Sequence, residues 1–252
     1  MFNLRAVTKS ILSRVENDTG KSIQFMRDES LPVLATLQMA RNGAEFHVLR
    51  YRPSDDPLDY LIAYQAGFVL RLFENEPADR FDFAPLPDVG KRVESLVAAG
   101  QALGPVDRQM LPEFSKFVGQ WALMNLRSLP IGMRIDQWIA TELPDLRELQ
   151  DASIALQQQQ NLDLLSLRQG KLTVPTPLMG AVAAYALFAD RLAGGGVYSI
   201  PYGAAGVLAQ GEQLLSIWDE VPAGSTHDRK LVDLWAAAEG LTGWFNWIPY
   251  QP

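Results

Sequence analysis

The sequence contains no cysteine and only two histidines, His47 and His227. Without cysteine the chain has no disulfide, no thiolate metal site and no cysteine nucleophile. A metal site with two histidine ligands would need both histidines, which lie far apart in the sequence. We therefore predict that the protein binds no metal and carries no other cofactor.

Long hydrophobic runs and basic runs are also missing. The longest apolar run, 178–189, is about a dozen residues, too short to cross the ~30 Å hydrocarbon core of a bilayer. The first residues lack the apolar core of a signal peptide. The net charge is −7, and an acidic chain without a basic block is a poor candidate for binding phosphate backbones. We expect a soluble, cytoplasmic protein that binds neither membranes nor nucleic acids.

The composition is that of a folded protein. The chain has 252 residues, 48% of them hydrophobic, which is enough for a sizeable core and excludes general disorder. Strand and helix patterns alternate at first, and helical patterns dominate from residue 88. We predict a mainly helical α+β fold, in which a small N-terminal mixed sheet packs on a central helix and a helical C-terminal region follows. The two regions, 1–87 and 88–252, should pack together as one compact unit.

The N-terminal region begins with one helix and several short strands. Apolar residues at helical spacing predict an amphipathic helix over 4–17. The candidate strands are 22–27, 33–40 and 46–52. Asn42-Gly43 is a hairpin signal between the last two. Segment 33–40 also fits a short helix capped by Ser30, and its periodicity does not decide between the two.

Residues 59–71 are predicted to form the central helix of the N-terminal region. Apolar residues lie on nearly every side of it, as is typical of a helix in the middle of a domain. Asp59 or Ser54 is suited to begin the helix, and Pro57 is tolerated in a first turn, where no N–H is needed. The candidate strand 46–52 comes directly before it.

Within this helix, segment 63–70 reads Ala-Tyr-Gln-Ala-Gly-Phe-Val-Leu. It resembles the A-H-E-x-G-H-x-L/I helix of zincin-type zinc metallopeptidases, most closely those of the ImmA/IrrE family, which also place a strand before it. In that family the helix supplies two zinc histidines and a general-base glutamate. Tyr64, Gln65 and Phe68 stand at these positions here, while Gly67 remains. The resemblance implies a zincin-like region over 1–87 whose zinc motif has been lost.

The substituted side chains have different chemistry from the motif. Two histidines at i and i+4 share a helix face and bind one metal, and the glutamate between them activates its water. Phe68 has no metal-binding atom and Gln65 cannot accept a proton from water. Tyr64 could replace the missing groups only as a phenolate, and an ordinary tyrosine pKa near 10 disfavours that form at neutral pH. The simpler interpretation is an aromatic pair in the core, one helical turn apart.

Two further polar residues, one in the preceding strand and one at the end of this helix, are candidates for a site. His47 lies within strand 46–52, where a lone histidine is typically a hydrogen-bonded structural residue rather than a ligand. Arg71 is suited to hold a ligand carboxylate or phosphate, and it is equally suited to pair with Glu74 or Asp79. The candidate cleft residues are therefore His47, Tyr64, Gln65, Phe68 and Arg71.

The remainder of the chain is predicted to be helical. The expected helices are 88–101, 107–128, 134–142, 144–160, 178–191, 204–219 and 228–240. Leu129-Pro130 should end the second of them in a turn. Thr176 should cap the helix at 178–191, and residues 225–228 should cap the last one rather than form a catalytic triad. Residues 74–87, rich in Pro and Asp, are expected to be a connection.

Two segments are candidates for contacts with other molecules. The three glycines at 194–196 permit close approach of the backbone to a ligand, although such a stretch is more often a simple loop. The tail 241–250 is dense in aromatic residues and should dock either on its own chain or on a partner. The partner-contact candidates in the tail are Trp244, Phe245, Trp247 and Tyr250.

Taken together, these features predict a binding protein more than an enzyme. We expect a non-catalytic, pseudo-metallopeptidase-like binding or regulatory protein that holds a peptide or protein partner, by strand addition to an edge strand near 46–52. The alternatives are an enzyme of metal-independent chemistry that uses a cleft around the central helix, and a structural subunit of a larger complex. The sequence does not specify an oligomeric state.

Overall fold

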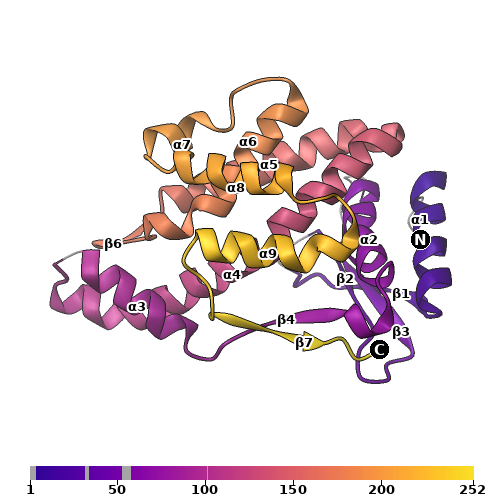
Figure 1. Ribbon diagram of the computed structural model, residues 1–252, viewed down its shortest axis with the longest axis horizontal. Coiled ribbons are helices and arrows are strands. Elements are labelled where there is room, and N and C mark those ends of the chain that lie inside the picture. The colour runs from indigo at the N-terminus through magenta and orange to yellow at the C-terminus, as the bar shows by residue number, and fades with distance from the viewer. Residues whose placement is uncertain (1–3, 32–33, 53–57, 101) are drawn as a thin grey trace. The chain divides into compact units, whose positions relative to one another are not determined.

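The computed structural model describes residues 4–31, 34–52, 58–100 and 102–252 (Figure 1). The chain forms two compact units, each assembled from separate stretches of sequence. The first unit consists of Met1–Asp82, Arg134–Ile154 and Ile248–Pro252, and the second of Phe83–Met133 and Ala155–Trp247. These bounds differ from the predicted division at residue 87. The zincin-like character of region 1–87 stays a prediction.

The described part of the chain is a mainly helical α+β fold, as predicted. Its α-helices are α1 (Ala6–Thr19), α2 (Asp59–Phe73), α3 (Val89–Gly100), α4 (Pro105–Glu142), α5 (Arg147–Leu165), α6 (Gly180–Ala193), α7 (Ile200–Ala204), α8 (Leu208–Glu220) and α9 (Asp228–Ala238). Its strands are β1 (Ser22–Arg27), β2 (Ala35–Gln38), β3 (Phe46–Tyr51), β4 (Phe81–Pro85), β5 (Arg168–Gln169), β6 (Leu172–Thr173) and β7 (Phe245–Pro249). No helix in these described ranges has the length and apolar character needed to cross a membrane.

The sheet of the first unit is small and mixed, which confirms the prediction. Its strand order is β1-β3-β2, with β1 parallel and β2 antiparallel to β3. Segment 33–40 contains the strand Ala35–Gln38 rather than a helix. Asn42 and Gly43 both have positive φ, 54° and 80°, and turn the chain between β2 and β3. The predicted edge strand near 46–52 is wrong, because β3 lies between the other two strands.

Helix α2 packs on α1 and β2 in the first unit. Its apolar side chains are buried, including Ile62, Ala66 and Val69, as expected of a central helix. Asp59 does not cap it: the preceding residue is Leu58, and the Asp59 carboxylate instead accepts hydrogen bonds from the Arg5 N–H (2.8 Å) and the Thr8 hydroxyl (2.6 Å). The other proposed start signals, at positions 54 and 57, lie outside the described residues.

The predicted turn at Leu129-Pro130 is wrong, because α4 continues through it. Proline removes one helical N–H and crowds the preceding turn, at a cost of ~3 kcal/mol in an exposed helix. Here both residues are buried, and so are Leu126 and Met133 one turn away on either side. The carbonyl of Pro130 also accepts a hydrogen bond from the Trp218 indole N–H at 3.0 Å. Tertiary packing thus overrides the local signal.

The described chain contains a pair of strands that the sequence did not reveal. Residues 81–85, expected to be a connection, form β4, which pairs with β7 in the aromatic tail. The Phe83 and Phe245 rings stack with centroids 4.2 Å apart, and the Leu86 N–H donates to the Trp244 carbonyl at 2.9 Å. The two partners are far apart in sequence, so no local pattern signals the pairing.

The predicted side-chain caps of two helices are wrong. Thr176 lies in a 3-10 turn (Thr176–Leu178), and α6 begins after Met179 without a side-chain cap. Residues 225–227 also form a 3-10 turn, and α9 begins after His227 without a side-chain cap. In both cases the 3-10 turn leads the chain into the helix in place of a capping side chain.

The close approach of α2 and α4 at Gly67 makes a testable prediction. A Cβ at Gly67 would lie 2.6 Å from Ile135 Cγ2, whereas one at Gly90 in α3 would meet its nearest atom at an ordinary 3.6 Å. We expect Gly67→Ala to lower the free energy of unfolding by about 1–3 kcal/mol through overpacking. Gly90→Ala should leave it unchanged or raise it slightly, since alanine favours helix. Urea denaturation of both variants is the measurement, and equal stability of the two would contradict the packing argument.

Candidate functional site

The three substituted motif positions lie on α2, where two of them form the expected aromatic pair. The Tyr64 and Phe68 rings meet edge to face, with centroids 5.4 Å apart and an interplanar angle of 82°. Tyr60 extends the row, with its ring centroid 5.9 Å from that of Tyr64. All these rings are at least partly buried, and Gln65 between them is partly exposed. The prediction of an aromatic pair is confirmed.

The phenol of Tyr64 is poorly suited to act as a base or an anionic ligand. Burial raises its pKa above the ordinary value, and the nearby Asp136 carboxylate raises it further. Both effects disfavour the phenolate at neutral pH. The position therefore supports packing rather than proton transfer.

A buried polar network lies beside this row and was missed by sequence reasoning. The Tyr60 hydroxyl donates to Asp136 Oδ1 at 2.7 Å, and the Gln150 side-chain amide donates to the same oxygen at 3.0 Å. The same amide also donates to the Asp136 backbone carbonyl at 2.8 Å. These bonds connect α2, α4 and α5 through a fully buried carboxylate. The available signal was an aspartate flanked by apolar residues at helical spacing, Ile135 and Ile139.

His47 has the hydrogen-bonded structural role predicted for it. Its Nδ1 accepts the Ala40 N–H at 3.0 Å, and its Nε2 lies 2.9 Å from the Thr19 hydroxyl oxygen. Because Nδ1 is an acceptor, the proton of the neutral ring belongs on Nε2. Burial lowers the pKa of His47, which favours this neutral form. Both ring nitrogens are thus engaged within the fold.

The second histidine is placed differently. His227 ends the 3-10 turn before α9, in the second unit, whereas His47 belongs to the first. Among the residues that the structure describes, no group of three or more histidine, aspartate or glutamate side chains is arranged to hold a metal ion.

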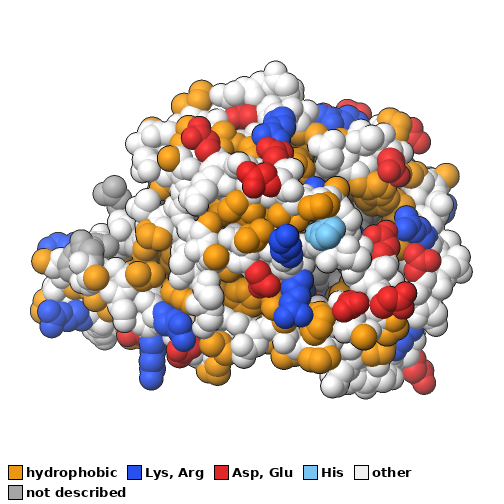
Figure 2. Space-filling model, in the orientation of Figure 1, with side chains coloured by type: hydrophobic (Ala, Val, Ile, Leu, Met, Phe, Trp, Pro, Cys, Tyr) orange, Lys and Arg blue, Asp and Glu red, His pale blue; other side chains and the backbone are white. Residues whose placement is uncertain are grey.

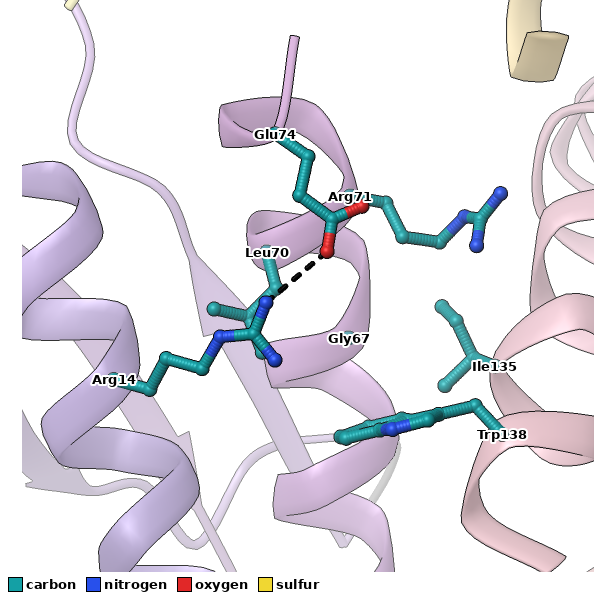
Figure 3. Close-up of a pocket in the computed structure, with 7 residues that line it drawn as sticks. All are labelled: Arg14, Gly67, Leu70, Arg71, Glu74, Ile135 and Trp138. Carbon is teal, nitrogen blue, oxygen red and sulfur yellow. Dashed lines mark hydrogen bonds and ion pairs between the residues drawn. The ribbon is translucent and has the colours of Figure 1, made fainter. Parts of the chain in front are cut away.

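Of the predicted cleft residues, Arg71 alone lines a pocket in the described part of the first unit (Figure 3). The pocket has a volume of about 120 Å³ and is lined by Arg14, Gly67, Leu70, Arg71, Glu74, Ile135 and Trp138. Glu74 forms an ion pair with Arg14 at 3.1 Å, and the Arg71 side chain points away from both (Figure 3). Arg14 and Trp138 come from α1 and α4, so no local motif on α2 indicates them.

The glycine loop at 194–196 is a simple loop held by the chain itself. Asp190, in the last turn of α6, accepts the backbone N–H groups of Val197 and Tyr198 at 2.8 Å each and that of Ser199 at 3.0 Å. Consecutive backbone N–H groups of this kind attract anions. Here an internal carboxylate takes that position, so the loop is ordered by Asp190.

The aromatic tail packs mainly on its own chain. Trp244, Phe245 and Tyr250 are buried and Trp247 is partly exposed. The Trp247 indole N–H donates to Asp233 at 2.8 Å, and the Tyr250 hydroxyl donates to the Ala40 carbonyl. These side chains therefore leave a partner little aromatic surface in the tail.

The carboxyl group of Glu239, in the second unit, has a strongly shifted pKa, and sequence reasoning did not identify this residue. Glu239 is buried and accepts the Ala181 N–H at 2.8 Å, near the N-terminus of α6. Burial raises its pKa from 4.5 to about 7, and the hydrogen bond only partly opposes this. The group satisfies a helix end that lacks a side-chain cap.

No protein-family model, curated protein or solved structure matches the chain.

Glu239 predicts a defined dependence of stability on pH. The unfolded chain ionises this carboxyl from about pH 4.5, while the folded chain keeps it protonated to about pH 7, so stability falls between these values. A shift of this size corresponds to at most ~3 kcal/mol. We expect Glu239→Gln to match the natural chain near pH 4.5 and to be about 1–3 kcal/mol more stable at pH 8.

Urea denaturation at the two pH values is the measurement. Glu212→Gln, an exposed position in α8 with the same change of charge, is the control and should show no such difference. A stability gain for Glu239→Gln that does not depend on pH would contradict the assignment.

Proposed function

We propose that this protein is a non-catalytic, pseudo-metallopeptidase-like binding or regulatory protein that holds an extended peptide segment of a partner along β1. The observation that carries the proposal is the position of β1 at the edge of the first unit's sheet. Adjacent apolar side chains on this strand, Phe25 and Met26, are each 46% exposed. Exposed edge strands with apolar side chains are sites of pairing with other chains.

The backbone geometry of β1 supports pairing on the side away from β3. The Asp28 N–H donates to the Tyr51 carbonyl of β3 at 2.9 Å, whereas the Ile23 N–H donates to the Glu16 carboxylate at 2.8 Å. Backbone groups of successive strand residues alternate in direction. The even-numbered residues of β1 therefore face β3, and the odd-numbered ones, including Arg27, face the edge.

The side chains at the edge agree with a peptide partner. Phe25 shares a face with Leu49 and Met26 shares the opposite face with Arg50, as the β1–β3 register requires. A paired peptide would receive main-chain hydrogen bonds from the strand and an apolar contact on each face. The aromatic pair at Tyr64 and Phe68 supports the non-catalytic part of the proposal, because these side chains pack against each other where the resembled motif binds zinc.

A pair of substitutions at Arg27 tests strand addition. Arg27→Pro removes an edge-facing N–H while leaving the bonds to β3 in place, and Arg27→Ala removes only the side chain. Peptides selected from a random-sequence display library on the purified natural chain are the probes, and fluorescence anisotropy gives their affinities. We expect Arg27→Pro to bind at least tenfold more weakly than Arg27→Ala.

The thermal unfolding midpoint of both variants serves as the folding control. Similar affinities of the proline and alanine variants would contradict strand addition at β1. Two further peptides are N-methylated, one at the odd-numbered and one at the even-numbered residues. Only one of them should lose affinity, since just one edge of the peptide faces the strand.

A further inference from the structure

The pocket of the first unit is enclosed by three helices that are far apart in sequence. Arg14 comes from α1, and Ile135 and Trp138 come from α4 (Figure 3). Gly67, Leu70 and Arg71 come from α2, and Glu74 is the residue directly after it. Because Gly67 has no side chain, α2 approaches α4 closely and presents backbone to the pocket. A volume of about 120 Å³ is comparable to the ~150 Å³ of an engineered apolar cavity that holds one benzene ring.

The pocket has a flat aromatic floor. In Figure 3 the Trp138 indole lies at the bottom of the view, and the Arg14 guanidinium lies higher and to the left of it. The indole N–H donates to Glu142 at 3.0 Å, which fixes the orientation of the ring. A fixed indole face favours the stacking of another flat ring.

The opposite side carries a cation that already holds a carboxylate. Arg14 pairs with Glu74 at 3.1 Å inside the pocket and with Asp18 at 3.3 Å one turn along α1. These three side chains are partly exposed, so the pair is weak and readily exchanged. Glu74 thus marks the position at which a ligand carboxylate would meet the guanidinium.

We propose that this pocket binds a small, planar, single-ring carboxylate. The ring stacks on Trp138, and the carboxylate displaces Glu74 and accepts hydrogen bonds from Arg14, whose planar fork matches a carboxylate. This site is separate from the β1 edge and takes a different class of ligand. It does not depend on strand addition.

Three probe compounds separate the features on which this proposal depends. Benzoate has both the ring and the charge, benzamide has the ring without the charge, and cyclohexanecarboxylate has the charge without a flat ring. Titration of the full chain, followed through the ¹⁵N-indole resonance of Trp138, gives the affinities, and Trp138→Phe assigns that resonance. Benzoate should bind saturably and at least tenfold more tightly than either analogue.

Charge-matched variants test the displacement of Glu74. Glu74→Gln removes the competing carboxylate and should tighten benzoate binding about threefold or more, whereas Arg14→Gln should weaken it at least tenfold. Glu29→Gln makes the same change of charge at an exposed residue that pairs with Arg27 outside the pocket, and should bind like the natural chain.

Several outcomes would overturn the proposal. They are benzamide binding as tightly as benzoate, weaker binding in Glu74→Gln, and an unperturbed Trp138 resonance at saturating benzoate. Glu74→Gln keeps the size and polarity of an exposed side chain, so we expect it to fold like the natural chain. Its benzoate affinity therefore tests the displacement of Glu74 even if Arg14→Gln lowers stability.

Discussion

The close packing of α2 against the C-terminal part of α4 is the constraint on which the first unit depends. At Gly67 a single added methyl group would lie 2.6 Å from Ile135 Cγ2, so any side chain there forces the packing to shift. Nearby, Tyr60 and Gln150 both bond to the buried carboxylate of Asp136, which adds α5 to the same contact. A buried charge is tolerated only where several donors satisfy it, so the helices must meet in one register. Gly67 and Ile135 also line the pocket, so this contact sets the position of its wall.

Several buried ionisable groups of the described chain bond to structural partners. Asp59 joins α2 to α1, His47 connects the β2–β3 turn region with the end of α1, and Asp190 organises the loop that follows α6. Each donates or accepts within its own unit. Their partners are backbone N–H groups and threonine hydroxyls of the same unit. That pattern is the physical basis for proposing binding over catalysis.

Local patterns predicted the elements whose causes are local. The helices α1 and α2 and the strands β1 and β3 follow from local patterns, whereas periodicity left 33–40 open between a strand and a helix. The Asn42-Gly43 turn follows from its need for positive φ. The sequence could not show that α4 passes through Pro130, because burial by distant residues outweighs the local cost of proline. Nor could it show the β4–β7 pairing or the shifted pKa of Glu239, since both require residues brought together by the fold. Of the cleft candidates, only Arg71 lines the pocket. The sequence could not identify Arg14 and Trp138 as lining residues, because they come from other helices that the fold brings to α2.

Helix α1 connects the two proposed binding surfaces physically. Arg14 lines the pocket, and Glu16, two positions further on, accepts the Ile23 N–H at the edge of β1. The helix is anchored by the buried side chains Ile11, Leu12 and Val15. Two ligands influence one another only if each binds two states of the linking element with different affinity. A helix anchored in this way has little freedom to shift, so the fold favours independent binding at the two surfaces. Coupling would instead have to act through the Arg14 and Glu16 side chains.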